Sequence, residues 1–137
     1  NRSSRGLGDV YKRQDQWNTS HHNSSGLTQK VKESNITESI AEKKTLEFLS
    51  KYVPKGTAPL CGNTICQDRR FLARCMPQLE SFCHYRSVDV TSIRELGKRW
   101  YFEDIDNFQK NSNHRALDDI RDSIEELRYY RKTIFKL

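Results

Sequence analysis

The sequence lacks the features of a membrane protein and of a zinc protein. No apolar run approaches the ~20 residues of a membrane-spanning helix. The N-terminal residues show no charged-then-apolar pattern of a secretory signal. The cysteines at positions 61, 66, 75 and 83 form no Cys-x2-Cys pair, the spacing typical of zinc sites. Reduced thiols in an intracellular protein are therefore favoured over disulfides.

The composition is polar for a globular protein, with 34% hydrophobic and 31% charged residues. Aromatic residues make up 10% of the chain, which argues against full disorder. A length of 137 residues suggests one domain. The net charge of +6 is a weak sign of nucleic-acid binding, because residues 1–14 hold four Lys or Arg and one Asp.

Local patterns divide the chain into two parts. Residues 1–14 show no helical or strand periodicity, so we interpret them as a disordered head or a cloning or sequencing remnant, with the second preferred. Residues 15–137 form the predicted domain. Its polar start, 15–26, is expected to be a loop. Helices are predicted over 27–33, 37–52, 67–76, from about 91 to 100, and after 113, with strands over 60–62 and 85–90.

This order of helices and strands predicts an α/β domain with a central sheet. Only two strands are visible, as in a truncated domain. In the 37–52 helix, apolar residues at 40, 46, 49 and 53 predict a core-facing stripe. The last helix places Leu117, Ile120, Ile124, Leu127 and Ile134 on one amphipathic face.

Three residues could carry chemistry. Asp68 lies early in a helix that follows a strand, where α/β proteins bind ligands, although such an Asp alone is more often a helix cap. His114 lies just before the last helix, and Asp119 lies in its first or second turn. If His114 is still in the loop, both side chains can approach one point. Asp118 is the alternative metal ligand.

The joint pattern is more specific than any of these residues alone. Gly-Asn-x4-Asp-Arg-Arg-Phe-Leu occupies 62–72, His-Tyr-Arg-x2-Asp-Val occupies 84–90, and His-Arg-Ala-Leu-Asp-Asp occupies 114–119. The tail from Glu126 to Arg131 adds Glu-Leu-x-Tyr-Tyr-Arg. These motifs resemble the oligoribonuclease family, 3′-to-5′ exonucleases that use four carboxylates and a histidine. The resemblance covers about nine-tenths of the chain.

The resemblance implies a fold and an activity. The fold would be the C-terminal part of a ribonuclease H-like exonuclease, with helices packed on a central mixed sheet whose first strands are missing. The activity would be hydrolysis of short oligoribonucleotides, such as dinucleotides, to mononucleotides by two metal ions, Mg²⁺ or Mn²⁺. By resemblance, Asp68 and Asp119 bind metal and His114 is the general base.

The resemblance also implies substrate contacts. Trp17 would stack on a base and His22 would lie on the substrate side, although a Trp in a polar loop can equally be an ordinary surface residue. Thr64 keeps the hydroxyl of a Ser that is frequent in the family. Tyr85 and Arg86 would reach across a homodimer interface to the terminal phosphate. Without the resemblance, they read as a polar edge-strand segment.

The family's first motif, an Asp-x-Glu, has no match, because none of the nine Asp residues has Glu two positions later. We therefore expect an N-terminally truncated chain that is inactive as given. An alternative is a catalytically inactive dinucleotide-binding or dimerisation protein of the same descent. A related DNA exonuclease is a third reading, which the His-Tyr-Arg run and the tail disfavour. Cytoplasm and mitochondrion both remain open as the location.

Overall fold

The computed structural model describes residues 20, 22–101, 105, 108–110 and 115–135. The chain divides into two compact units, Asn1–Thr37 and Glu38–Leu137. The first unit contains helix α3 (Leu27–Glu33), which matches the predicted 27–33 helix. It begins after Gly26, whose φ of 74° is in the left-handed region that glycine adopts without steric cost.

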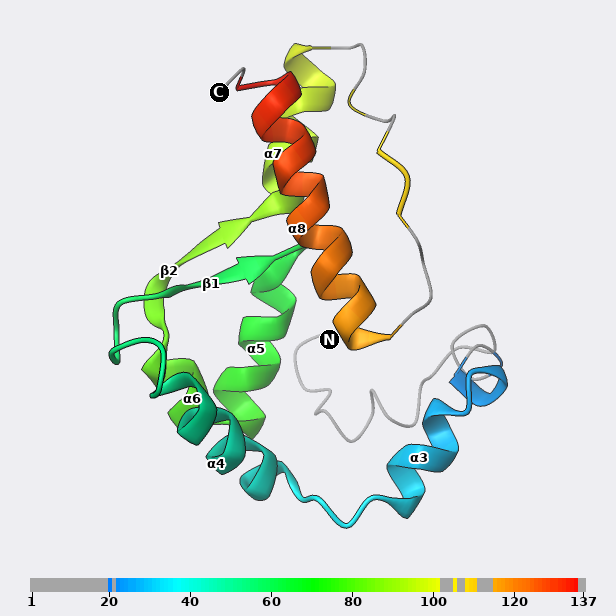
Figure 1. Cartoon of the computed structure of the whole chain (residues 1–137), viewed down its shortest axis with the longest axis vertical. Coiled ribbons are helices and arrows are strands. Elements are labelled where there is room, and N and C mark those ends of the chain that lie inside the picture. Colours follow the sequence, from blue (N-terminus) through cyan, green and yellow to red (C-terminus); the bar gives the residue numbers. More distant parts are fainter. Residues whose placement is uncertain (1–19, 21, 102–104, 106–107, 111–114, 136–137) are drawn as a thin grey trace, which may run out of the picture. The chain divides into compact units, whose positions relative to one another are not determined.

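The second unit is built around two parallel strands (Figure 1). Strand β1 (Pro59–Gly62) pairs with β2 (His84–Asp89), and the register places Gly62 opposite Asp89 at their carboxyl ends. Parallel strands need a crossover, which here consists of helices α5 (Ile65–Cys75) and α6 (Pro77–Phe82). The predicted α/β class and both predicted strands are confirmed.

The other helices of this unit are α4 (Glu38–Leu49), α7 (Val90–Trp100) and α8 (Ala116–Thr133). Val90, Ile105 and Tyr130 form the buried core between α7 and α8, and Ile93, Leu127, Tyr129 and Ile134 pack against it. Gly97 allows this close packing, because an added Cβ would clash with Ile105 Cδ1 and lie 3.1 Å from Ile134 Cδ1. Residues of β1 contact α5, α7 and α8, so the carboxyl end of the sheet meets three helices.

Helix α6 was not predicted, because Pro77 was interpreted as the end of the preceding helix. Pro77 is instead the first residue of α6, a position that tolerates proline because its missing N–H has no intrahelical partner. The buried Glu42 carboxylate of α4 accepts hydrogen bonds from the N–H groups of Gln78 (3.0 Å) and Leu79 (3.2 Å). A distant carboxylate therefore satisfies the start of this helix.

The predicted core-facing stripe on the 37–52 helix is wrong at Ile40, which is 42% exposed. Helix α4 buries Glu42 instead, because this side chain has the α6 N–H groups as partners. The last helix is confirmed, but its apolar face is only partly covered. Leu127 and Ile134 pack on the core, whereas Leu117, Ile120 and Ile124 are exposed.

All four cysteines lie within the described residues, and the structure joins none of them in a disulfide. Burial raises the pKa of the Cys83 thiol, while Arg69 opposes and Glu80 adds to that increase. Within the described part of the chain, no helix combines the length and apolar character needed to cross a membrane.

Candidate active site

A strained turn joins β1 to α5 at the centre of the site. Thr64 has φ 50° and ψ 40°, a left-handed conformation that is uncommon for a residue other than glycine. Its backbone N–H donates to Asp89 Oδ1 and to Thr91 Oγ1, both at 2.9 Å. The same Asp89 oxygen accepts from the Thr91 N–H and caps α7. The start of α7 therefore holds the turn in place.

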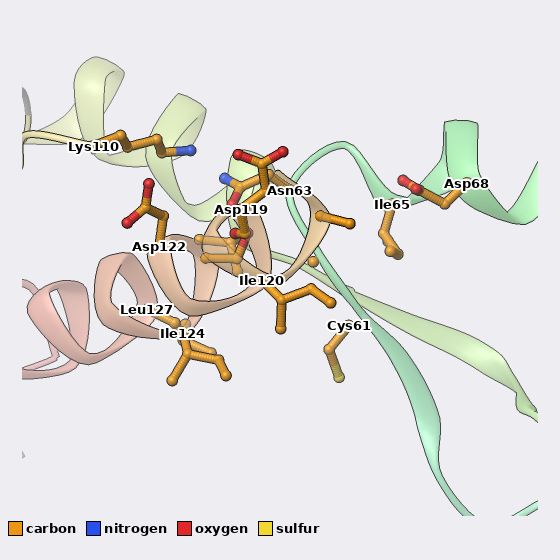
Figure 2. A pocket seen from close by; sticks show the side chains of 14 residues that line it. Cys61, Asn63, Ile65, Asp68, Lys110, Asp119, Ile120, Asp122, Ile124 and Leu127 are labelled. Atoms are coloured by element: carbon orange, nitrogen blue, oxygen red, sulfur yellow. Dashed lines mark hydrogen bonds between the residues drawn. The ribbon is translucent and has the colours of Figure 1, made fainter. Parts of the chain in front are cut away.

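Asp68 and Asp119 line one cavity of about 800 Å³ (Figure 2). Asp68 is in the first turn of α5, directly after the strained turn. Asp119 is in the first turn of α8. Both side chains are exposed, so bound water or a ligand can reach their carboxylates. The two predicted metal ligands, 51 positions apart in the sequence, thus share one open site.

The cavity has a polar side and an apolar side (Figure 2). The polar side carries three carboxylates and one ammonium group, from Asp68, Asp119, Asp122 and Lys110. The apolar side is formed by residues of β1, α5 and α8, namely Cys61, Ile65, Ile120, Ile124 and Leu127. An excess of negative charge over apolar walls favours a cation, since the low-dielectric wall strengthens the field of the carboxylates.

A buried hydrogen-bond network lies beside this cavity. Glu126 of α8 is 1% exposed, and its carboxylate accepts from Asn63 Nδ2 (2.9 Å), Lys110 Nζ (2.6 Å) and Tyr130 Oη (2.7 Å). Burial alone would raise the pKa of Glu126. The hydrogen bonds from Lys110, Tyr130 and Asn63 outweigh burial and hold that pKa below its ordinary value. The carboxylate is therefore charged at neutral pH.

The donor set suits a hard divalent cation. Carboxylate oxygens are the ligands that Mg²⁺ prefers, and proteins commonly hold this ion through one or two carboxylates while phosphates and waters complete its shell. Among the residues that the structure describes, no three His, Cys, Asp or Glu side chains cluster as a metal site.

Tyr85 and Arg86 lie on β2, and neither lines the cavity. The His84 and Tyr85 rings stack at 4.5 Å, and the Arg86 guanidinium lies 5.3 Å from the centre of the Tyr85 ring. Arg69 braces this segment by donating to the carbonyl groups of His84 (2.9 Å) and Arg86 (3.3 Å). Tyr85 is 74% exposed, so its ring is available to a ligand or another protein.

The other predicted site residues fall in different places. Thr64 lies in the strained turn, where its hydroxyl is 3.1 Å from that of Thr91. His22 belongs to the first unit. Trp17 and His114 lie outside the described residues. Asp118, the alternative ligand, does not line the cavity and lies 3.8 Å from Arg121 Nη1.

The family model described as "Exonuclease" matches residues 10–127 of this chain. The oligoribonuclease of Halorhodospira halophila is 54% identical over 123 residues, which cover 90% of this chain and 67% of that relative. This chain belongs to the oligoribonuclease family. The predicted resemblance is thereby confirmed.

Two other oligoribonucleases match this chain with similar identity and coverage. The Marinobacter nauticus oligoribonuclease is 56% identical over 123 residues, covering 90% of this chain and 68% of that relative. The Pseudomonas putida protein is 53% identical over 129 residues, covering 94% of this chain and 72% of that relative. The chain thus spans about two thirds of the length of the curated relatives that it matches.

Sequence reasoning missed the residues that join the two carboxylates. Asn63 was assigned only to a turn, and Glu126 only to a family-like tail. The helical spacing held a signal, because Asp122, Ser123 and Glu126 follow Asp119 by three, four and seven residues and share its side of α8. Lys110 had no recognisable pattern, since its partner is 16 residues away in a different element.

Proposed function

We propose that this protein is a 3′-to-5′ exoribonuclease that degrades short oligoribonucleotides, such as dinucleotides, to mononucleotides. The observation that carries the proposal is the shared cavity, into which α5 contributes Asp68 and α8 contributes Asp119. Membership of the oligoribonuclease family supports the reaction class. The open, acidic cavity is suited to a chain end, because it has room for a nucleotide and its cations.

Asp68 and Asp119 would hold Mg²⁺ or Mn²⁺ together with the scissile phosphate. A bound divalent cation relieves the negative charge that develops on the phosphate and lowers the pKa of a bound water. Within the family motif, His114 is the proposed general base, and an imidazole nitrogen would accept the proton of the attacking water. Its position one residue before Arg115, the N-cap residue of α8, places it near Asp119 in the sequence.

The proposed substrate contacts come from several segments of the chain. Thr64 adjoins Asp68 through the strained turn and offers a hydroxyl. Trp17 is the proposed contact to a base, and His22 is a proposed substrate-side residue. Tyr85 and Arg86 are exposed and form a ring-and-guanidinium pair, which suits a terminal phosphate presented by the other subunit of a homodimer.

The test is cleavage of a labelled RNA dinucleotide by the purified protein, with Mg²⁺ or Mn²⁺ and with a chelator. The given sequence has no Asp-x-Glu motif, so we expect metal-dependent release of mononucleotides from a longer chain that includes this motif and not from the given residues alone. In that longer chain, D68N and D119N should each lower kcat by about a hundredfold or more. The matched control is D118N, which should retain activity because Asp118 does not line the cavity. The corresponding DNA dinucleotide tests the choice of RNA.

Two outcomes would contradict the proposal. If D118N and D119N lowered kcat equally, lining the cavity would not identify the carboxylate that takes part in the reaction. Tight binding of the RNA dinucleotide without any cleavage, by a chain that includes an Asp-x-Glu motif, would favour the non-catalytic binding protein instead. Sedimentation of the same sample at several concentrations tests the proposed homodimer, for which an exclusively monomeric protein would be the contrary result.

A further inference from the structure

The Asn63 side chain connects the two elements that carry the cavity carboxylates. Its Oδ1 accepts a hydrogen bond of 2.5 Å from the Ser123 hydroxyl of α8. Its Nδ2 donates to Glu126 Oε2 at 2.9 Å, one helical turn further along α8. One amide therefore contacts α8 at two points, which fixes the position of the strained turn along the helix as well as beside it.

Each end of this connection leads to one carboxylate. Asn63 is followed by Thr64 and then by α5, whose first turn contains Asp68. Ser123 lies one turn after Asp119, and its hydroxyl is also 3.0 Å from the Asp119 carbonyl oxygen. Because both hydrogen bonds act across 60 and 63 positions of sequence, local propensities of α5 or α8 cannot replace them.

The Glu126 carboxylate is held in place as the acceptor for the Asn63 amide. It is almost completely buried, and two further donors, Lys110 and Tyr130, occupy its carboxylate from other directions. A buried carboxylate with several partners has little freedom to rotate, because each lost hydrogen bond leaves an unsatisfied polar group. The acceptor that Asn63 meets is therefore fixed in place.

We propose that Asn63 and Glu126 are positioning residues that set the placement of Asp68 relative to Asp119 and thereby the affinity of the cavity for a divalent cation. The inference rests on the proposed function for the role of these carboxylates as metal ligands. Asn63 also lines the cavity, whereas Glu126 does not. They act through the strained turn and through α8, as partners outside the ligand shell do in other metal sites.

The experiment measures binding of Mn²⁺ alone to the whole chain by isothermal titration calorimetry, with urea unfolding as a parallel measure of stability. N63A is expected to weaken Mn²⁺ binding about tenfold. E126A should weaken it similarly. E126Q should restore most of the affinity, since a Gln oxygen can still accept from Asn63.

The matched control is Y130F. It removes another partner of Glu126 and lowers stability, but it leaves the Asn63 connection to Glu126 and Ser123 intact. We expect its dissociation constant for Mn²⁺ to stay within about twofold of the unmodified protein, a change that lies inside the usual spread of binding free energies. The comparison therefore separates positioning from a general loss of stability.

The proposal is overturned if N63A and Y130F weaken Mn²⁺ binding equally at equal stability, or if N63A leaves the affinity unchanged. It is also overturned if the unmodified chain binds no Mn²⁺. Asn63-dependent binding of Mn²⁺, together with no cleavage of the RNA dinucleotide by a chain that includes an Asp-x-Glu motif, would refute the proposed activity and support the positioning role. The Mn²⁺-binding assay thus tests the positioning role, and the cleavage assay independently tests the proposed activity.

Discussion

Two faces of α8 differ in a way that residue type alone does not explain. On one face Glu126 and Tyr130 are 1% and 0% exposed, whereas on another Leu117 and Ile120 are each 57% exposed. The buried pair share a hydrogen bond, and Glu126 has further donors from β1's following turn and from Lys110. Of the exposed pair, Ile120 lines the cavity.

The comparison teaches that satisfied hydrogen bonds, rather than polarity, decide which face of this helix is buried. A carboxylate can be removed from water when charged and neutral donors replace its hydration. Exposed apolar side chains carry little penalty individually, because much of any protein surface is apolar. The following predictions test this contrast, beginning with the largest expected effect.

E126A should lower the free energy of unfolding by about 3 kcal/mol, because it removes the buried carboxylate that accepts hydrogen bonds from Asn63 and Tyr130. The Lys110 side chain is 35% exposed and can be hydrated, so it adds little to the cost. The control I124S, on the exposed face, should change stability by about 0.5 kcal/mol or less. Urea unfolding measures both variants. A larger loss of unfolding free energy for I124S than for E126A would contradict the proposed difference between the two faces of α8.

G97A should cost about 2 kcal/mol, because the added methyl group overlaps Ile105 and crowds Ile134 at the covered end of α8. Alanine has a higher helix propensity than glycine, so a decrease in stability in G97A would show that close packing outweighs this propensity. S92A, at an exposed position of the same helix, is the control and should be close to neutral. A stabilised G97A protein would show that α7 and α8 are not tightly packed.

Y130F should cost about 1 kcal/mol, since it removes one donor from Glu126 while retaining the buried ring. The exposed Tyr52, with 70% exposure, provides the control Y52F. Thermal unfolding of the two variants should differ, with the lower midpoint for Y130F. Identical midpoints would indicate that the hydroxyl of Tyr130 contributes nothing net to the buried face.

The pH dependence should show the smallest effect. The pKa of Glu126 is lowered on folding from its ordinary value near 4.5, so the stability that its charge contributes is present above pH 4.5 and is lost as pH falls through the lower folded pKa. Urea unfolding between pH 7 and 3 should show a steeper acid loss for the unmodified chain than for E126Q. Equal slopes would contradict the charged state of this buried carboxylate.

Sequence patterns predicted elements well and their environments less well. The last helix followed from apolar spacing, but its buried face did not, because two partners of the buried Glu126 are Asn63, 63 positions away, and Lys110 in a loop. Helix α6 was missed since its capping carboxylate, Glu42, lies 36 positions before Gln78. The pairing of Asp68 with Asp119 came from the family motifs, which record a long-range arrangement that local periodicity lacks.

The link between Asn63 and α8 has a consequence for the order in which the protein folds. Synthesis proceeds from the N-terminus, so β1 and its turn leave the ribosome more than sixty residues before their partner Glu126. Until α8 is made and docks, the Asn63 amide lacks its Ser123 and Glu126 partners. The cavity that Asp68 and Asp119 line is therefore completed only after α8 has been made and has docked.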